Sequence, residues 1–365
     1  MPQGDTLAEP TARRRLLDLA GVMTTPLLPD DYLTAVNPLW AFSELRGRIE
    51  QIIPRTREAA TIVIRPGRRW PGHRAGQHLA LGVDVDGVRH WRSYSLTSDP
   101  RRPDGCISVT VKAVDGGTVS SHLVYRAAVG DLIRLGPPEG EFVLPRDAGQ
   151  RPMLFITAGS GITPVMSMLR ELESAGALGD VVHVHSERTA DQVIFGPELR
   201  RLADEQATVV RHERHTHAAP RLAPTDLDEL CPDWRERDTY ACGPMGLLDA
   251  VEAHYAAAGL TERLAIERFE IALIGADPGD GGTATIGDLT FESAAGVPLL
   301  VSGEDAGLVL RSGCRMGICH TCVCTLVDGQ ARDLRTGELI RDPGADVQLC
   351  VSAAAGDLTL QAAKA

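Results

Sequence analysis

Residues 152–176 read PMLFITAGSGITPVMSMLRELESAG, and this stretch decides the fold of the central part of the chain. Its first seven residues are uncharged and mostly apolar, which is typical of a buried parallel strand. A GSG turn follows at 159–161, and Thr163 and Pro164 then suit the N-cap and the first position of a helix. The sequence therefore predicts a strand, a glycine turn and a helix whose free amide groups face an anionic ligand.

Downstream of this stretch, strand-like and helix-like segments alternate. Strands are expected at 181–186, 207–213 and 238–243, and helices at 163–176, 196–205 and 245–259. Alternation of this kind predicts an open, doubly wound α/β domain, to which we assign residues 149–272. The glycine turn matches the dinucleotide fingerprint imperfectly. Either it binds a nucleotide, or its glycines only let the strand and the helix pack closely.

The chain upstream has short apolar strands separated by Gly, Pro and Asp turns. Six strands are expected, at 46–53, 59–66, 77–83, 90–96, 106–114 and 131–136. This pattern predicts an antiparallel barrel over residues 46–148. Arg92 and Tyr94 share one face of the fourth strand, where they form a phosphate-binding groove or simply an ordinary strand end. The turn GGTVSS at 116–121 opens a short helix and offers amide groups to a pyrophosphate.

Five of the eight cysteines lie between residue 314 and the C-terminus. Four of them have the C-x4-C-x2-C…C spacing of plant-type [2Fe–2S] ligands, namely Cys314, Cys319, Cys322 and Cys350. A structural zinc site is the alternative, although zinc sites usually pair two C-x2-C units. Cys324 is left over and is expected to be a buried thiol. We expect residues 273–282 to be a linker and 283–365 to be a small cluster-binding unit.

Composition and charge exclude several classes of function. The chain has 365 residues, 43% of them hydrophobic and 24% charged, and a formal net charge of −12. This apolar content excludes a disordered chain. The acidic balance argues against nucleic acid as a partner, because phosphate binding needs a basic face. Neither a secretory signal nor a spanning helix is expected, which indicates a cytoplasmic protein with at most peripheral contact to a membrane.

The order RSYS, GGTVS, AGSGITP and CGPM resembles the ferredoxin–NADP reductase superfamily, and the C-terminal cysteine unit resembles the plant-type ferredoxins, which have a β-grasp (α+β) fold. The resemblance implies that the barrel binds flavin, as FAD rather than FMN, and that the α/β domain binds NAD(P)H. The flavin residues that it implies are Arg92, Tyr94, Ser95, Gly117, Thr118 and Ser120. The nucleotide residues that it implies are Gly159, Gly161, Thr163, Ser186, Arg188, Gly243 and Pro244.

The same resemblance brings three side chains to the place where nicotinamide meets flavin. They are Ser95, Cys242 and Phe269. The thiol and the aromatic ring can also be explained as ordinary core side chains. For the choice of coenzyme, Ser186 and Arg188 suit the 2′-phosphate of NADPH, whereas Glu187 suits the free 2′-hydroxyl of NADH. We expect NADPH.

Together these sites predict an electron-transfer reductase. Hydride passes from NAD(P)H to FAD, and single electrons then leave through the [2Fe–2S] cluster to a partner oxygenase. Within the leader, which we assign to residues 1–45, the stretch that begins at Leu16 and runs on to Ile49, together with CRMGICHTC at 314–322, resembles actinobacterial reductases that serve acyl-CoA desaturases, so a membrane desaturase is the expected acceptor. The alternatives are the reductase of a Rieske oxygenase, a hydroxylase or a cytochrome P450, a redox-sensing iron–sulfur flavoprotein, or a flavin reductase with a merely structural C-terminal unit.

The apolar residues of the leader have two interpretations. Leu27, Leu28, Trp40 and Phe42 either dock a partner oxygenase or a membrane surface, or pack on the flavin barrel of the same chain. We favour the second interpretation.

Overall fold

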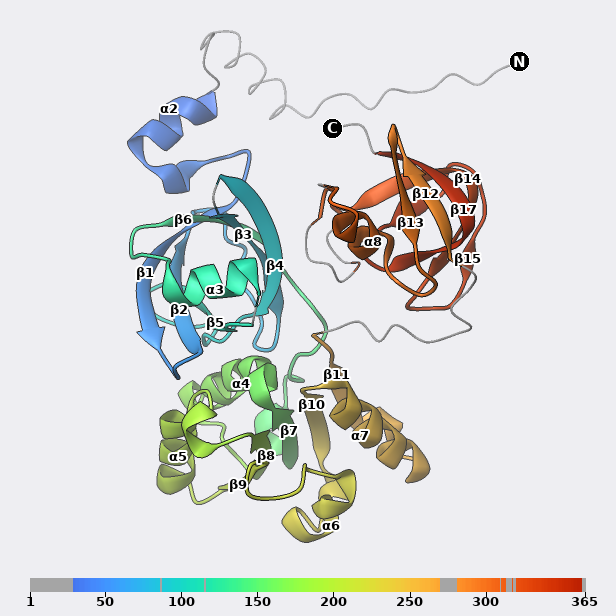
Figure 1. Cartoon of the computed structure of the whole chain (residues 1–365). Coiled ribbons are helices and arrows are strands. Elements are labelled where there is room, and N and C mark those ends of the chain that lie inside the picture. Colours follow the sequence, from blue (N-terminus) through green and yellow to red (C-terminus); the bar gives the residue numbers. More distant parts are fainter. Residues whose placement is uncertain are drawn as a thin grey trace, which may run out of the picture.

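The protein, described here by a computed structural model, contains three sheets that follow one another along the chain (Figure 1). The structure describes residues 29–85, 87–114, 116–269, 281–308, 310–312, 317 and 320–362. The first sheet is antiparallel, the second is parallel and the third is mixed. The predicted combination of a barrel, a doubly wound α/β domain and an α+β ferredoxin-type domain is therefore confirmed.

The first domain is a six-stranded antiparallel barrel with the strand order β4-β3-β6-β1-β2-β5. Its strands are β1 (Arg46–Pro54), β2 (Ala59–Pro66), β3 (His78–Val85), β4 (Val88–Ser95), β5 (Ile107–Lys112) and β6 (Leu132–Glu139). The barrel closes just beyond β4, where Leu96 pairs with Val109 and the amide of Thr97 donates to the carbonyl of Ser108 over 2.7 Å. Closure leaves no open sheet edge at this point and brings the end of β4 next to β5.

Helix α3 (Thr118–Tyr125) lies against this barrel (Figure 1). Its buried residues Val119 and Leu123 belong to the same apolar core as Ile62 and Leu79 of the strands. The GGTVSS turn is therefore anchored by a helix that the barrel core holds in place.

The second domain has a five-stranded parallel sheet with the order β11-β10-β7-β8-β9. Its strands are β7 (Met153–Ala158), β8 (Val181–Glu187), β9 (Val209–His215), β10 (Asp238–Cys242) and β11 (Leu264–Glu267). Its helices are α4 (Ile162–Ser174), α5 (Gly196–Glu205), α6 (Leu227–Leu230) and α7 (Met245–Ala257). Two separate apolar clusters, one with α4 and α5 and the other with α6 and α7, cover the two faces of the sheet. Because all five strands are parallel, the loops that follow them lie at the same edge of the sheet, where α/β sheets bind ligands.

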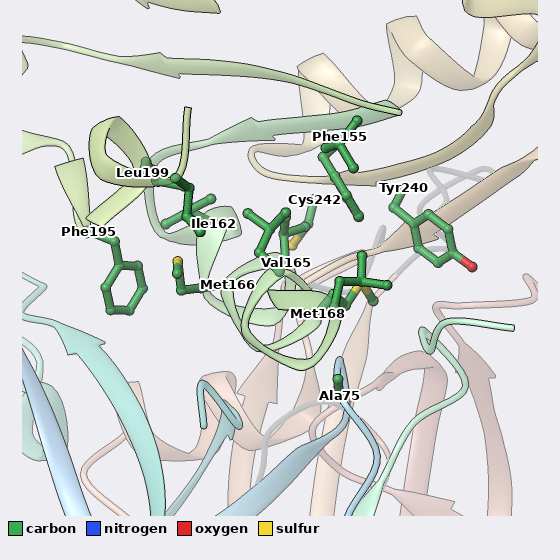
Figure 2. Close-up of a cluster of buried hydrophobic side chains, with 14 of the residues drawn as sticks. Ala75, Phe155, Ile162, Val165, Met166, Met168, Phe195, Leu199, Tyr240 and Cys242 are labelled. Carbon is green, nitrogen blue, oxygen red and sulfur yellow. The ribbon is translucent and has the colours of Figure 1, made fainter. Parts of the chain in front are cut away.

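The barrel and the parallel sheet share one apolar cluster (Figure 2). Ala75 of the barrel lies near Met168 of α4 in this view, and both are buried. The rings of Phe142 and Tyr240 meet edge to face with their centroids 5.4 Å apart. The hydroxyl of Ser167 on α4 donates to the carbonyl of Ser98 over 2.7 Å. This packing fixes the segment after β4 against helix α4 of the parallel sheet.

The third domain is a mixed sheet with the order β13-β12-β17-β14-β15, and β16 pairs with β14. Its elements are β12 (Gly282–Ile286), β13 (Leu289–Ser293), α8 (Leu299–Asp305), β14 (Val323–Asp333), β15 (Leu339–Ile340), β16 (Asp346–Gln348) and β17 (Ser352–Ala362). Strands β12 and β17 are parallel, and the other pairs are antiparallel. Helix α8 contributes Leu299 and Leu300 to the core of this sheet.

Part of the leader packs on the barrel. A helix that the sequence did not predict, α2 (Pro29–Val36), is followed by a short 3-10 turn at Pro38–Trp40. The guanidinium of Arg68 lies 4.7 Å from the centroid of the Trp40 ring, and Phe42 accepts a hydrogen bond at its carbonyl from Arg69. The described part of the leader thus contacts the barrel through the ring of Trp40 and the backbone of Phe42, whereas the Phe42 side chain is 49% exposed and Leu27 and Leu28 lie outside the described residues. Among the helices that the structure describes, none has the length and apolar character to cross a membrane.

Candidate functional site

A cleft of about 860 Å³ lies at the carboxyl ends of β7, β8 and β10. It gathers nearly all the nucleotide residues named from the sequence, together with several that were not. Its lining includes Lys112, Gly159, Ser160, Gly161, Ser186, Glu187, Arg188, Arg221, Gly243, Pro244 and Phe269. Apart from Lys112, which ends β5 of the barrel, these residues follow parallel strands of the second domain, so the cleft has the position that α/β sheets use for nucleotides.

The GSG turn forms the floor of this cleft. Gly159 has a φ of 56°, which favours glycine, and a Cβ on Gly161 would lie 2.1 Å from the carbonyl oxygen of Cys242. Gly161 therefore lets the loop after β7 touch the loop after β10. No side chain caps the 3-10 turn at Gly159–Gly161, and the amide of Ile162 donates to the carbonyl of Ser160, so the amide groups that can face a ligand in the cleft are those of the glycine turn itself.

The prediction that Thr163 is the N-cap of this helix is wrong. The GSG turn is itself a 3-10 turn, and it runs directly into α4 so that the backbone is already helical at Ile162. Thr163 is buried, and its hydroxyl donates to the carbonyl of Ser160 over 2.9 Å. Pro164 is accordingly the third residue of the helix. Thr163 stabilises the turn from behind and is absent from the cleft lining.

The opposite wall of the cleft carries the residues that bear on coenzyme choice. Ser186 and Glu187 are buried, whereas the side chain of Arg188 is 62% exposed. One carboxylate oxygen of Glu187 lies 3.4 Å from Nζ of Lys112, and the other accepts from the amide of Arg188 over 3.0 Å. Lys112 comes from the barrel, and neither it nor Arg221 was singled out in the sequence.

Cys242 and Glu267 lie at the ends of two neighbouring strands; neither lines the cleft, and Cys242 is fully buried in the apolar cluster below Gly243. They are register partners on the parallel strands β10 and β11, and Figure 2 shows Cys242 among the apolar side chains around Val165. Burial raises the pKa of the Cys242 thiol well above its ordinary value, and the neighbouring Glu267 raises it further. Burial also raises the pKa of Glu267, against the opposing effect of His78.

Three polar atoms at the seam between barrel and nucleotide domain find no hydrogen-bond partner among the described residues. They are Oγ of Ser95, Nε2 of His78 and Oε2 of Glu267. His78 and Ser95 are opposite each other on β3 and β4, and Nδ1 of His78 lies 3.5 Å from Oε1 of Glu267. The sequence singled out Ser95 but not His78, and at the end of β11 it chose Phe269 rather than Glu267. A polar ring that inserts here would satisfy the unpaired atoms, so this seam fits a flavin.

Arg92 and Tyr94 lie on β4, as expected, opposite Leu81 and Leu79 of β3. Tyr94 is mostly buried, and burial raises its pKa well above the ordinary value although Arg92 acts in the opposite direction. One guanidinium nitrogen of Arg92 donates to the carbonyl of Trp91 over 2.7 Å. The pair thus presents a charged and an aromatic group on one strand near the seam.

The glycine turn of the barrel leads directly into a helix. Gly117 is the N-cap of α3 and Thr118 its first residue. The hydroxyl of Ser120 accepts from the amide of Val114 over 3.2 Å, and a Cβ on Gly117 would lie 2.5 Å from that hydroxyl oxygen. No side chain caps α3, so its first amide groups are available to a phosphate, as the sequence predicts.

Two of the four predicted cluster cysteines are described, and they lie in one core. Cys322 and Cys350 are both buried, and the amide of Leu349 donates to the carbonyl of Cys322 over 3.2 Å. Cys314 and Cys319 lie outside the described residues. Cys324 is buried as expected. Its burial, and to a smaller extent the neighbouring Cys322, raise its pKa to about 11. The donor set of adjacent buried thiols suits a sulfur-ligated iron cluster.

A flavin seam beside a nucleotide cleft, together with a cysteine-bearing third domain, defines a class of redox protein that takes electrons from a nicotinamide coenzyme. Comparison with known families gives the same assignment in three parts. Residues 69–144 match the "Oxidoreductase FAD-binding domain", residues 155–253 the "Oxidoreductase NAD-binding domain" and residues 284–355 the "2Fe-2S iron-sulfur cluster binding domain".

The chain is also similar to whole proteins of this kind. It is 47% identical over 350 residues to the "NADPH oxidoreductase" of Mycobacterium tuberculosis, which covers 94% of this chain and 91% of that protein. It is 30% identical to the "Glycine betaine monooxygenase reductase subunit" of Pseudomonas aeruginosa, over 78% of this chain and 86% of that protein. The structure of phthalate dioxygenase reductase superimposes with a TM-score of 0.59 at 25% identity, over 87% of this chain and 97% of that one.

This chain belongs to the family of ferredoxin–NADP reductase-type flavoproteins that carry a C-terminal [2Fe–2S] ferredoxin domain. It is an NAD(P)H-dependent oxidoreductase with FAD and a [2Fe–2S] cluster, so the predictions of enzyme class and cofactors are confirmed. The roles of the individual site residues stay predictions.

Proposed function

We propose that this chain is the reductase component of an oxygenase system and supplies a partner oxygenase with single electrons from NADPH. The main support for the proposal is that the cleft for the coenzyme lies next to the seam with the unpaired polar atoms. Cys242 and Glu267 are neighbours on adjacent strands, and Glu267 reaches His78 of the flavin barrel. Two similar proteins support the oxygenase partner, since both are named as reductases of a monooxygenase or a dioxygenase.

Each cofactor has a set of candidate residues in this proposal. FAD would be held by Arg92, Tyr94, Ser95, Gly117, Thr118 and Ser120. The coenzyme would lie on Gly159, Gly161, Ser186, Arg188, Gly243 and Pro244, with Thr163 supporting the turn from behind. The cluster would be held by Cys314, Cys319, Cys322 and Cys350. Bound FAD accepts two electrons together and releases them one at a time, which matches a two-electron donor to a one-electron cluster.

The residues at the seam have separable roles. Ser95 offers its unpaired hydroxyl to the flavin ring. Glu267 keeps a proton to higher pH than an exposed glutamate, because its burial raises its pKa, and its unpaired Oε2 can hold that proton at the seam. The Cys242 thiol also stays protonated, since burial raises its pKa, and it offers the nicotinamide a neutral contact. Phe269 lines the cleft and helps to exclude water.

The geometry of the cleft supports NADPH rather than NADH. Glu187, the residue that would bind a free ribose hydroxyl, is buried and contacts Lys112 and the amide of Arg188 instead. Arg188 is exposed and is paired with Glu58 over 3.4 Å, and Arg221 lines the same cleft, so a 2′-phosphate would meet two guanidinium groups there and compete with Glu58 for the first. The name of the similar Mycobacterium tuberculosis protein, "NADPH oxidoreductase", agrees with this choice.

The narrower expectation of an acyl-CoA desaturase as acceptor has less support. It rests on the resemblance of residues 16–49 and of CRMGICHTC at 314–322, and of these segments residues 16–28, 314–316, 318 and 319 lie outside the described residues. The similar proteins with a named partner system instead serve a monooxygenase and a dioxygenase. The proposal therefore favours a monooxygenase or dioxygenase as the acceptor. Reconstitution of the protein and NADPH with an oxygenase or with a desaturase tests this choice, and turnover with the desaturase alone would contradict it.

The substitution Cys350→Ser tests whether electrons leave through the cluster. We expect cytochrome c reduction to fall by about 100-fold, because loss of a cluster ligand removes the one-electron exit. Reduction of ferricyanide by NADPH, which FAD alone can perform, should stay within about twofold of the wild type. Both rates are measured with the purified protein, with NADPH and with NADH, and NADPH should give the higher kcat/KM.

The matched control is Cys324→Ser, which removes a buried thiol that the ligand spacing leaves out. It should keep both activities. Equal loss of cytochrome c and ferricyanide reduction in Cys350→Ser, with FAD still bound, would contradict electron exit through the cluster.

A further inference from the structure

Arg335 stands directly after β14, beside the segment that carries Cys350. The amide of Leu334 donates to the carbonyl of Val351 over 2.8 Å, and this bond ties the turn to the residue after Cys350. The guanidinium of Arg335 is held on one side by Asp333, whose carboxylate accepts from Nε over 3.1 Å and from Nη2 over 2.5 Å. The orientation of the side chain is therefore fixed by a bidentate ion pair.

The remaining guanidinium nitrogen reaches the loop between the first two cluster cysteines. Nη1 of Arg335 donates to the carbonyl of Gly317 over 3.4 Å, and Nε2 of Gln348 donates to the same carbonyl over 2.9 Å. Gly317 is buried and has a φ of 70°. A Cβ at this position would lie 2.5 Å from Nη1 of Arg335. A glycine is therefore required for the arginine to approach this loop.

The charge of this group acts on the cluster ligands. The pKa of Arg335 is raised first by its hydrogen bonds to Asp333 and in addition by the negative charge that Cys350 and Cys322 carry as thiolates. For Asp333, burial alone would raise the pKa, but the bonds from Arg335 lower it overall. The guanidinium is thus tied through Nη1 to the ligand loop at Gly317, its backbone neighbour Leu334 is bonded to the residue after Cys350, and Asp333 holds the guanidinium through Nε and Nη2.

We propose that Arg335 is a positioning residue that raises the reduction potential of the [2Fe–2S] cluster, by holding the Gly317 carbonyl of the ligand loop and by directing its positive charge at Cys322 and Cys350. This inference rests on the proposed function, in which these cysteines hold the cluster. Reduction adds one electron to the cluster and makes it more negative by one charge. A fixed guanidinium nearby favours that reduced state, and Asp333 moderates the effect.

Two substitutions test the proposal with opposite signs. Arg335→Gln keeps a hydrogen-bond donor but removes the charge, and it should lower the equilibrium constant for one-electron reduction of the cluster between about threefold and tenfold. A tenfold change corresponds to about 59 mV for a one-electron couple. Asp333→Asn leaves the guanidinium less compensated and should raise the same constant. The measurement is a redox titration of the purified holoprotein, followed by the EPR signal of the reduced cluster.

Arg341→Gln is the matched control. Arg341 is exposed, contacts Gln330 over 3.1 Å, and its loss changes the net charge of the domain by the same amount as Arg335→Gln. Its cluster should titrate like the wild type. If Arg335→Gln fails to assemble a cluster, Asp333→Asn still decides the sign.

An unchanged potential in Arg335→Gln, or a lowered one in Asp333→Asn, would overturn the inference while leaving the proposed function intact. A wild-type protein without the EPR signal of a reduced cluster would overturn the proposed function itself. The two failures are therefore distinguishable.

Discussion

Single side chains at the seam of the first two domains are the most informative residues of the molecule. Ser95, His78 and Glu267 each leave a buried polar atom without a partner. A buried group of this kind costs about 1–3 kcal/mol when it stays unsatisfied. The protein therefore carries a local destabilisation at this seam that a bound flavin can offset, and functional sites are where such conflicts are expected.

Glu267 gives this destabilisation a pH dependence. Burial raises its folded-state pKa, so the unfolded chain releases this proton first as the pH rises. The contribution of Glu267 to stability is fully present below the ordinary glutamate pKa, about 4.3, and is lost as the pH rises through the folded value. Between the ordinary glutamate pKa and the folded-state pKa of Glu267, the Tm of Glu267→Gln should therefore fall less than that of the wild type. The same substitution should also slow the reduction of FAD by NADPH.

The measurement is the melting temperature of the FAD-bound protein from about pH 4 to pH 8, with Glu262→Gln, an exposed glutamate of the same domain, as the control. The control should melt like the wild type at every pH. A Glu267→Gln protein whose Tm varies with pH as the wild type does would refute the role assigned to this burial.

At this scale the sequence predicted residues that stand inside a recognisable motif. Ser95 follows RSY and Cys242 begins CGPM, and both lie next to the seam or the cleft. His78, Lys112 and Arg221 were not predicted, because each acts through contact with a different domain or loop. Nothing in the spacing of a single sequence shows that Lys112 of the barrel meets Glu187 of the nucleotide domain.

At the scale of elements, the turn between β7 and α4 touches the loop after β10, and both loops line the coenzyme cleft. Helix α5 begins and ends at the residues predicted for it, because its apolar residues recur with helical spacing. The first residue of α4 was predicted at Pro164, two residues after its actual start at Ile162. This prediction relied on the Thr-Pro pair as a helix-start signal, whereas the glycine turn itself leads into the helix. The short strands β15 and β16, of two and three residues, are too brief to show a period of their own.

The substitution Gly161→Ala tests whether the close approach of the loops after β7 and β10 contributes to stability and to coenzyme binding. The new Cβ would lie 2.1 Å from the carbonyl oxygen of Cys242, so one of the two loops must move. We expect a loss of about 1–3 kcal/mol in the free energy of unfolding and a raised KM for NADPH, with FAD binding retained. Urea denaturation and steady-state kinetics measure the two effects.

Gly246→Ala is the comparison variant for stability alone, because a Cβ there meets nothing within 4 Å and the residue is the second of helix α7, where it also lines the cleft. It should leave stability unchanged or raise it by up to about 1 kcal/mol. Equal destabilisation by the two substitutions would mean that the close approach of the two loops is unimportant.

At the scale of the whole molecule, the contact between the first two domains matters more than their order along the chain, because the FAD-binding domain precedes the NAD-binding domain although electrons pass from the coenzyme to FAD. The barrel and the parallel sheet share one core, and their contact places the coenzyme cleft next to the flavin seam. The third domain holds buried cysteines in a core of its own. The sequence predicted this division because each domain has a different periodicity and its own motif. It did not predict the seam, which exists only where two domains meet.

An anaerobic titration of the oxidised protein with NADPH tests this serial arrangement most directly. The account predicts that the wild type takes up one electron per chain more than Cys350→Ser, and that this electron appears as the EPR signal of a reduced cluster after the flavin absorbance has begun to bleach. Equal electron uptake by the two proteins, or a cluster that stays oxidised while the flavin is fully reduced, would contradict it.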